Sequence, residues 1–439
     1  MADLLALSAR IVDSGRVDQP VNRVSNELSE VDEHIAVVES FSHSVALRTE
    51  EGLVVFDASG APTGEAVVAA LRGWSEGPVN TLVYTHGHLD HVGGSPAFVS
   101  DAAARRHPRP RFVAHAGVRD RFARYRMTDG YNRHINARQF GWLRNPQLRI
   151  GAGGAGELDA TAGGRSGGAF LPDDVAEPDV AYHGRAAFSV GGVDVELHHA
   201  RGETDDHTWA WIPSLKAVCS GDFLIWNFPN AGNPQKVQRY PAEWATALRT
   251  MASLEPELLL PAHGLPIGGT DRVRRVLCEV ASALEHLVGE TLAMMNTGAS
   301  LDEVVHGVTV PADTLALPYL RPLYDEPEFV VRNIWRLYGG WWDGNPARLK
   351  PPPDAALAAE VATLAGGTEA LVARARGAAA TGDHRLACQL VEWATQADPA
   401  SAGAHRARAE LYQQRRDTET SLMAKGIFAS AVSESERRA

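Results

Sequence analysis

One short segment, Thr85-His86-Gly87-His88-Leu89-Asp90-His91, constrains this chain more than any other feature, because four of its side chains are potential metal ligands. It directly follows residues 81–84, an apolar run typical of a short strand. On extended backbone the first two histidines point to the same side and can bind one divalent ion, whereas Asp90 and His91 turn toward a second. Imidazole and carboxylate together suit zinc, iron or manganese. The segment therefore predicts a site for two metal ions at the end of a strand.

The rest of the chain divides by pattern into a strand-rich part and a helical part. Residues 35–57 contain strand-like runs bounded by turn formers, which predict an antiparallel sheet. Two later strand signals end on potential ligands, Asp222 and His263. Beyond about residue 273 the periodicity becomes helical, and residues 369–416 resemble helical-repeat hairpins. We expect a metal-binding domain over residues 1–290, a helical domain over 291–425 and a disordered tail over 426–439.

A glycine-rich stretch over residues 151–168 opens with a formal dinucleotide-binding pattern, GxGxxG. No strong strand precedes this pattern and no helical periodicity follows it, so the structural context that such a site requires is missing. We interpret the stretch as a long loop.

Composition and charge disfavour several kinds of protein, among them nucleic-acid-binding, disulfide-rich and membrane-spanning proteins. A length of 439 residues allows two or three domains, and a net charge of −12 disfavours nucleic acid as a partner. Three scattered cysteines argue against a disulfide framework or a thiolate zinc site. No apolar run reaches the roughly 18 residues of a membrane span, and the first residues lack the basic and apolar regions of a secretory signal. We expect a cytoplasmic protein without a membrane span.

The order of four motifs, His-x-His-x-Asp-His, Gly-Glu-Thr, Ser-Gly-Asp and Pro-Ala-His-Gly, resembles the metallo-β-lactamase superfamily over roughly residues 35–269. The resemblance implies an α/β fold, an αββα sandwich that holds two divalent ions at one edge between its sheets. Zinc is the expected metal, with iron or manganese as alternatives. The implied metal ligands, with Asp222 as the bridging carboxylate, are His86, His88, Asp90, His91, Glu203, Asp222 and His263.

Glu203 departs from the glycine-histidine-threonine pattern of many superfamily members. His199 or His207 could supply the third ligand of the first metal instead. Alkyl sulfatases resemble this chain in using a glutamate in that neighbourhood. Residues 334–347, which include Trp-Trp-Asp-Gly-Asn-Pro, also resemble the signature of their helical dimerisation domain and so imply a homodimer. Asp222, where those enzymes have glutamate, and the lack of a sterol-carrier-like C-terminal domain are departures from that branch.

We therefore predict a hydrolase of alkyl sulfate esters, in which a hydroxide that bridges the two metals attacks the substrate and Asp90 and Asp222 are the catalytic carboxylates. A guanidinium or ammonium group suits the sulfate oxygens, and the candidate groups belong to Arg133, Arg138, Lys236 and Arg239. Phe140, Trp142, Trp226 and Phe228 are candidates for an apolar channel.

Three alternative functions stay open. The aspartate at position 222 would also suit a hydrolase of a carboxylic ester, thioester or lactone. An iron-dependent oxidoreductase on the same fold is the second alternative. A helical scaffold with a vestigial metal site is the third, and the complete set of ligand-type residues argues against it.

Overall fold

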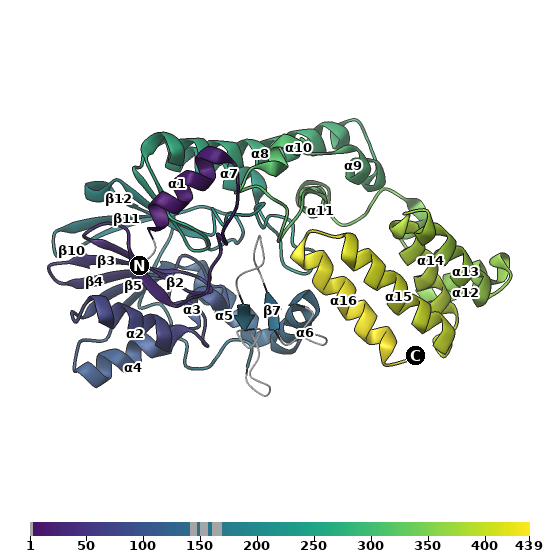
Figure 1. Cartoon of the computed structure of the whole chain (residues 1–439), viewed down its shortest axis with the longest axis horizontal. Coiled ribbons are helices and arrows are strands. Elements are labelled where there is room, and N and C mark those ends of the chain that lie inside the picture. The colour runs from purple at the N-terminus through teal and green to yellow at the C-terminus, as the bar shows by residue number, and fades with distance from the viewer. Residues whose placement is uncertain (1–2, 141–146, 150–156, 160–168) are drawn as a thin grey trace.

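The computed structural model describes residues 3–140, 147–149, 157–159 and 169–439. Two large sheets pack face to face near the N-terminal end of the molecule (Figure 1). The first is seven-stranded, antiparallel from β1 to β4 and parallel from β4 to β9. In spatial order it contains β1 (Glu27–Glu30), β2 (Ile35–Glu39), β3 (Ser44–Thr49), β4 (Gly52–Phe56), β5 (Val79–Val83), β6 (Arg111–His115) and β9 (Val180–Tyr182).

The second sheet is six-stranded, and its strands are antiparallel except for the parallel pair β13 and β14. Its strands are β10 (Arg185–Val190), β11 (Val193–His199), β12 (Thr208–Ile212), β13 (Ala217–Gly221), β14 (Leu258–Pro261) and β15 (Ile267–Gly268). Apolar side chains from both sheets, such as Val54 and Leu197, form one buried cluster between them. Strands β2 and β13 are buried along their whole length, as expected for strands covered on both faces.

Helices cover the outer face of each sheet and complete the four layers. Against the first sheet pack α2 (Gly64–Trp74) and α4 (Ser95–Arg105), through side chains such as Val67 and Phe98. Against the second pack α1 (Leu4–Ser14), α7 (Pro241–Ser253) and α8 (Thr270–Asn296). The short α3 (Leu89–Val92), α5 (Gly117–Met127) and α6 (Asp129–Phe140) lie near the end of the strands that carries the candidate ligands. The predicted αββα sandwich is confirmed.

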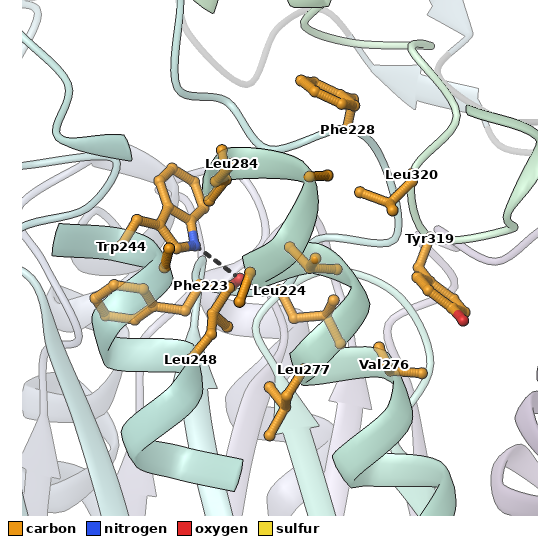
Figure 2. Close-up of a cluster of buried hydrophobic side chains, with 14 of the residues drawn as sticks. Phe223, Leu224, Phe228, Trp244, Leu248, Val276, Leu277, Leu284, Tyr319 and Leu320 are labelled. Carbon is orange, nitrogen blue, oxygen red and sulfur yellow. Dashed lines mark hydrogen bonds between the residues drawn. The ribbon is translucent and has the colours of Figure 1, made fainter. Parts of the chain in front are cut away.

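The core beneath the second sheet centres on Trp244 of α7, which is fully buried (Figure 2). Its indole Nε1 donates a hydrogen bond to the backbone oxygen of Phe223 at 3.0 Å, and the two rings meet edge to face at a centroid distance of 5.8 Å. Because Phe223 directly follows Asp222 in the chain, this packing anchors the segment that carries a candidate ligand.

A helical region follows α8, as predicted. It comprises α9 (Leu301–Gly307), α10 (Ala312–Ala316), α11 (Pro327–Gly339), α12 (Asp354–Ala365), α13 (Thr368–Ala380), α14 (His384–Ala397), α15 (Ala402–Thr418) and α16 (Leu422–Glu436). Alanine and leucine side chains of α12 to α15 make a separate buried cluster. The hairpins predicted over residues 369–416 are confirmed as α13, α14 and α15. Helix α8 runs through the domain boundary predicted at residue 290.

The prediction of a disordered tail over residues 426–439 is wrong. Most of these residues belong to α16, whose N-cap Ser421 accepts a hydrogen bond from the backbone N–H of Ala424. The buried face of the helix consists mainly of small residues such as Ala429 and Ser433, with Met423 and Val432. A helix that packs through small side chains shows little apolar periodicity, which is why the sequence pattern missed it.

The glycine-rich stretch over 151–168 lies outside the described residues, apart from β8 (Glu157–Asp159), which pairs with β7 (Gln147–Arg149). In the described part of the chain, no single helix is both long and apolar enough to cross a membrane. Helices α12 and α13 meet those criteria only as a pair, and they are bent by 84°.

Candidate metal centre

The candidate ligands meet where strands of both sheets end. The segment 85–91 follows β5, Asp222 follows β13 and His263 follows β14, while Glu203 lies in the loop between β11 and β12. Strands β13 and β14 are parallel, so their following residues reach the same edge of the sheet. Gly221 has a φ of 53°, and a Cβ there would come within 2.8 Å of His207 Nε2 and within 2.9 Å of the Cβ of Thr85, which follows β5 of the first sheet. A glycine at this position therefore allows the close approach of the two sheets at the site.

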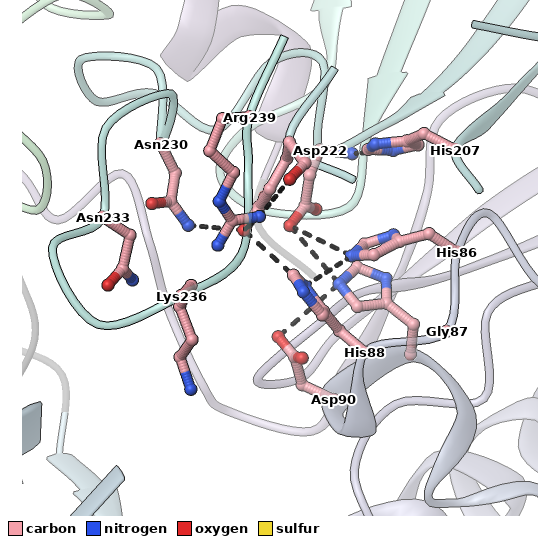
Figure 3. Close-up of polar contacts among 12 residues, drawn as sticks. His86, Gly87, His88, Asp90, His207, Asp222, Asn230, Asn233, Lys236 and Arg239 are labelled. Carbon is pink, nitrogen blue, oxygen red and sulfur yellow. Dashed lines mark hydrogen bonds and ion pairs between the residues drawn. The ribbon is translucent and has the colours of Figure 1, made fainter. Parts of the chain in front are cut away.

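A first group of ligand atoms comes from His86, His88, Glu203 and Asp222, and all of these atoms lie within 4.8 Å of one another (Figure 3). The Nδ1 of His88 is 3.6 Å from Glu203 Oε1 and 2.8 Å from His86 Nε2. His86, Glu203 and Asp222 are buried. This arrangement offers two imidazoles and two carboxylates to one ion.

A second group of ligand atoms comes from Asp90, His91 and His263, again within 4.8 Å of one another. The Nε2 of His263 is 3.3 Å from Asp90 Oδ2 and 3.5 Å from Asp222 Oδ1. The Nε2 of His91 is 3.4 Å from Asp222 Oδ2. Asp222 therefore lies between the two groups, the position that a bridging carboxylate requires.

The chemistry of the donor set fits divalent cations. Two buried atoms, His91 Nε2 and Asp222 Oδ1, have no hydrogen-bond partner in the described part of the chain. Burial lowers the pKa of His86 and of His88 well below the usual value for histidine, so both rings are neutral, the form that binds a metal. Among its ion-pair partners in the described residues, buried Asp222 has histidines but no lysine or arginine, and a bound cation would offset the cost of burying its charge.

Asp57 binds the Nδ1 side of the His91 imidazole and so orients this candidate ligand. Its Oδ2 accepts a hydrogen bond from His91 Nδ1 at 2.8 Å, and its two oxygens accept further bonds from Thr85 N and Oγ1 at 2.7 and 2.8 Å. The bond to Nδ1 directs the other ring nitrogen, Nε2, toward the centre. Sequence reasoning missed this residue, although a carboxylate directly after a buried strand, at the edge where the cluster lies, was a usable signal.

We expect Asp57→Asn to weaken metal binding by about 10- to 100-fold, because supporting partners of metal-bound histidines typically contribute that much. A chelator competition titration measures the change. Asp179→Asn is the matched control, since that carboxylate also accepts a backbone N–H bond, from Phe112 at 2.9 Å, but lies outside the metal groups. Equal metal affinity of the Asp57→Asn and Asp179→Asn proteins would show that Asp57 does not support the metal site.

The structure brings Glu203 rather than the two alternative histidines into the first group. The Nε2 of His207 accepts a hydrogen bond from the backbone N of Asp222 at 3.1 Å. His199 donates from Nδ1 to the backbone oxygen of His207 and stacks on His115 with a centroid distance of 3.7 Å. Glu203 itself is held by Asn230 and Arg239.

A pocket opens in front of the two groups. The polar part of its lining, called the polar wall below, includes Asn136, Gln139, Asn230, Asn233, Lys236 and Arg239. Figure 3 shows Asn230, Asn233 and Lys236 on one side and His86, His88 and Asp90 on the other. Its apolar wall includes Val24, Phe41, Leu89, Phe140, Phe170 and Ile225. The pocket therefore offers both cationic and apolar groups, which suit a ligand with an anionic part and an apolar part.

Lys236 and Arg239 line this pocket, as predicted for substrate-binding groups. The Lys236 ammonium donates to Asn136 Oδ1 at 2.9 Å. Burial, assisted by the charge of Arg239, lowers the pKa of Lys236 to about 7. Arg239 is buried and lies 3.3 Å from Glu203 Oε1 through its Nη1.

The prediction for the other two cations is not supported, because neither Arg133 nor Arg138 lines the pocket. Arg133 is exposed and pairs with Asp129 at 2.6 Å, and Arg138 contacts Gln235 and His134. Both project from a side of α6 other than the face that carries Asn136 and Gln139. The phase of this helix was not recognisable from its weakly amphipathic sequence.

The predicted apolar channel is only partly present. Phe140 lines the pocket, whereas Trp226 and Phe228 belong to the buried core of the second sheet. Trp142 lies outside the described residues. Gln139 and Tyr324, which sequence reasoning did not select, are further pocket residues.

Comparisons with known proteins agree with this architecture. The family model described as the metallo-beta-lactamase superfamily matches residues 37–263, and the model for alkyl sulfatase dimerisation matches residues 300–438. A linear primary-alkylsulfatase of Pseudomonas sp. (strain ATCC 19151) is 26% identical over 80% of this chain and 66% of its own length. An (R)-specific secondary-alkylsulfatase of Pseudomonas sp is also 26% identical, over 84% of this chain and 56% of its own.

The solved structure of the stereoselective inverting sec-alkylsulfatase Pisa1 from Pseudomonas sp. has a similar fold. It superposes with a TM-score of 0.80 at 23% identity, over 94% of this chain and 66% of that one. The chain thus spans 66% and 56% of the length of these two relatives, less than two thirds in each case. From the family match and the site geometry together, the chain belongs to the metallo-β-lactamase superfamily and carries a C-terminal alkyl sulfatase dimerisation domain.

Proposed function

We propose that this chain is a metal-dependent hydrolase of alkyl sulfate esters. The observation that supports the proposal most directly is the pocket, whose lining combines candidate metal ligands, cationic and amide groups, and apolar side chains. An organic sulfate presents a compact anion joined to an apolar chain, which matches both walls. The names of the alkylsulfatase relatives point to the same substrate class.

Two divalent ions held by the two ligand groups would supply a nucleophile at neutral pH and electrostatic stabilisation of the leaving group. Asp222 would contribute to both groups, because its Oδ2 lies 3.9 Å from His86 Nε2 of the first group and 3.4 Å from His91 Nε2 of the second. Asp90 lies at the mouth of the second group, and we assign its carboxylate to accept the proton that the attacking water releases. Zinc is the metal we propose, with iron and manganese as the alternatives.

The sulfate group would bind against Lys236 and Arg239. An anion beside the Lys236 ammonium favours the charged form of that group and so opposes the effect of burial. The side-chain amides of Asn233 and Gln139 line the same wall. The alkyl chain would lie against Phe41, Phe140 and Phe170, where burial of each methylene contributes about 0.8 kcal/mol.

We expect Lys236→Met to raise the KM for dodecyl sulfate by about 10- to 100-fold, because a hydrogen bond to a charged group typically contributes about 1.5–3 kcal/mol. Steady-state kinetics measure the change. Arg133→Met is the matched control, since it removes a cation from outside the pocket. A KM that rises as much in the control as in Lys236→Met would contradict the assigned sulfate site.

Asp222 supports a second candidate function, the hydrolysis of a carboxylic ester, thioester or lactone. The carboxylate between the two ligand groups is an aspartate, shorter than the glutamate of alkyl sulfatases. Turnover of acyl-thioesters or lactones without turnover of any alkyl sulfate would favour this candidate. Iron in the purified protein together with oxygen consumption would favour an oxidoreductase.

We also propose that the chain forms a homodimer through its C-terminal domain. Exposed apolar side chains gather on that domain, among them Trp341, Leu357 and Leu364, of which Leu364 is 87% exposed. We expect Leu364→Glu to shift the molecular mass in solution toward that of a monomer, as measured by light scattering. Met127→Glu, at a position 79% exposed on α5 of the catalytic domain, should leave the mass unchanged.

A further inference from the structure

The last helix of the dimerisation domain, α16, packs directly on α6 (Figure 1), the helix that carries Asn136 and Gln139 of the pocket lining. The contact is close at Gly426, where a Cβ would overlap the backbone oxygen of Gln139. Gln139 is buried and lines the pocket. A glycine at position 426 therefore allows α16 to touch the backbone of the pocket wall.

The start of α16 is attached to a second pocket element, the segment around Tyr324. The Ser421 hydroxyl donates to the backbone oxygen of Tyr324 at 2.8 Å, and the backbone N of Leu422 donates to Leu323 O at 2.8 Å. The phenolic oxygen of Tyr324 in turn accepts a hydrogen bond from Gln139 Nε2 at 2.9 Å. The side chain and the backbone of Gln139 are thus both held, directly or through Tyr324, by α16.

From α6 the contacts continue across the polar wall. Gln139 Oε1 accepts from Asn233 Nδ2 at 3.3 Å, and Asn136 Oδ1, one turn earlier, accepts from Lys236 Nζ at 2.9 Å. Asn230, in the same loop as Asn233 and Lys236, donates to Glu203. Hydrogen bonds therefore link α6 to the loop that carries the substrate-binding lysine.

We propose that Gly426 and Ser421 are positioning residues of the active site, through which the dimerisation domain fixes the sulfate-binding wall although neither residue lines the pocket. The proposal rests on the proposed function for its kinetic readout only. Because α6 and the loop 230–239 line the pocket and the candidate metal ligands lie on other elements, a shift of α6 should weaken substrate binding more than it slows turnover.

The test compares Gly426→Ala with Gly377→Ala in the full-length, metal-loaded protein. Gly377 lies in α13 of the same domain, and a Cβ there would meet no atom within 4 Å. We expect Gly426→Ala to raise the KM for dodecyl sulfate by about tenfold with kcat within about twofold, since a misplacement of about 1 Å can cost up to about a hundredfold. Gly377→Ala should leave both constants unchanged.

Hydrogen–deuterium exchange gives a second readout that needs no substrate. Exchange in peptides that cover α6 and residues 230–239 should rise in Gly426→Ala and stay at the parental level in Gly377→Ala. If the parent hydrolyses no sulfate ester, the proposed function fails, while the exchange result still decides the positioning role. Unchanged exchange and unchanged KM in Gly426→Ala would overturn the inference.

Ser421→Ala keeps the test decisive if Gly426→Ala does not fold. Ser421→Ala should raise the KM and the hydrogen–deuterium exchange of α6 by smaller factors than Gly426→Ala. Ser421→Thr retains the hydroxyl and should show parental values of both. An equal effect of both Ser421 variants, or no effect of either, would contradict the role of the Tyr324 contact.

Discussion

Replacement of Asp222 by alanine should lower kcat/KM for an alkyl sulfate by more than about 100-fold and should reduce the bound metal. Loss of a supporting residue around a metal typically costs about 10- to 100-fold, and loss of a ligand should cost more. Asp222 has the largest expected effect because it lies between both ligand groups, with Oδ2 3.9 Å from His86 Nε2 of the first and 3.4 Å from His91 Nε2 of the second.

Elemental analysis and kinetics on the same preparation measure this effect. Asp205→Ala is a suitable control, because that carboxylate is close in sequence to Glu203 but is half-exposed and bound to Arg121 outside the two groups. Asp222→Ala protein that keeps two metal ions and parental activity would show that the site has been assigned to the wrong residues.

Trp244→Ala should lower the free energy of unfolding by about 3–5 kcal/mol, the usual range for loss of a buried tryptophan. The indole is fully buried, contacts Phe223 and donates its N–H to the backbone of the same residue. Alanine would leave a cavity beneath the Asp222 segment and an unpaired backbone oxygen. Activity of the folded fraction should fall as well, because that segment carries Asp222, the proposed bridging carboxylate.

Urea denaturation followed by fluorescence measures the stability change. Trp244→Phe should lose less stability than alanine, because it keeps most of the buried surface and loses the hydrogen bond. Met127→Ala, at an exposed position, should change the free energy of unfolding by no more than about 0.5 kcal/mol. A Trp244→Ala protein as stable as Met127→Ala would contradict the packing around α7.

The sequence was most informative where ligand residues are adjacent in the chain or directly follow a strand. His86, His88, Asp90 and His91 lie in one short segment after β5, and Asp222 and His263 each follow a strand, so the common sheet edge brings them together. Glu203 was predicted from its place in an ordered set of motifs. The structure places it with His88, at a distance of 3.6 Å.

The polar wall was less predictable, because it depends on which face of a helix turns inward. In α6 the pocket face holds Asn136 and Gln139, and the arginines selected for their charge lie elsewhere on the helix. The packing of α16 was also hidden, because Gly426 and the small residues around it carry no apolar pattern. Contacts between distant segments, such as Gln139 with Tyr324, have no local signal in the sequence.

The central claim, a two-metal hydrolase of alkyl sulfates, is tested most directly by metal analysis coupled to a substrate panel on one preparation. We predict two divalent ions per chain, turnover of dodecyl sulfate that is lost on chelation and restored by zinc, and slower turnover of acyl-thioesters and lactones. A protein that binds two metal ions but hydrolyses only thioesters or lactones would contradict the sulfate assignment, and a protein that binds no metal would contradict the account of the site itself.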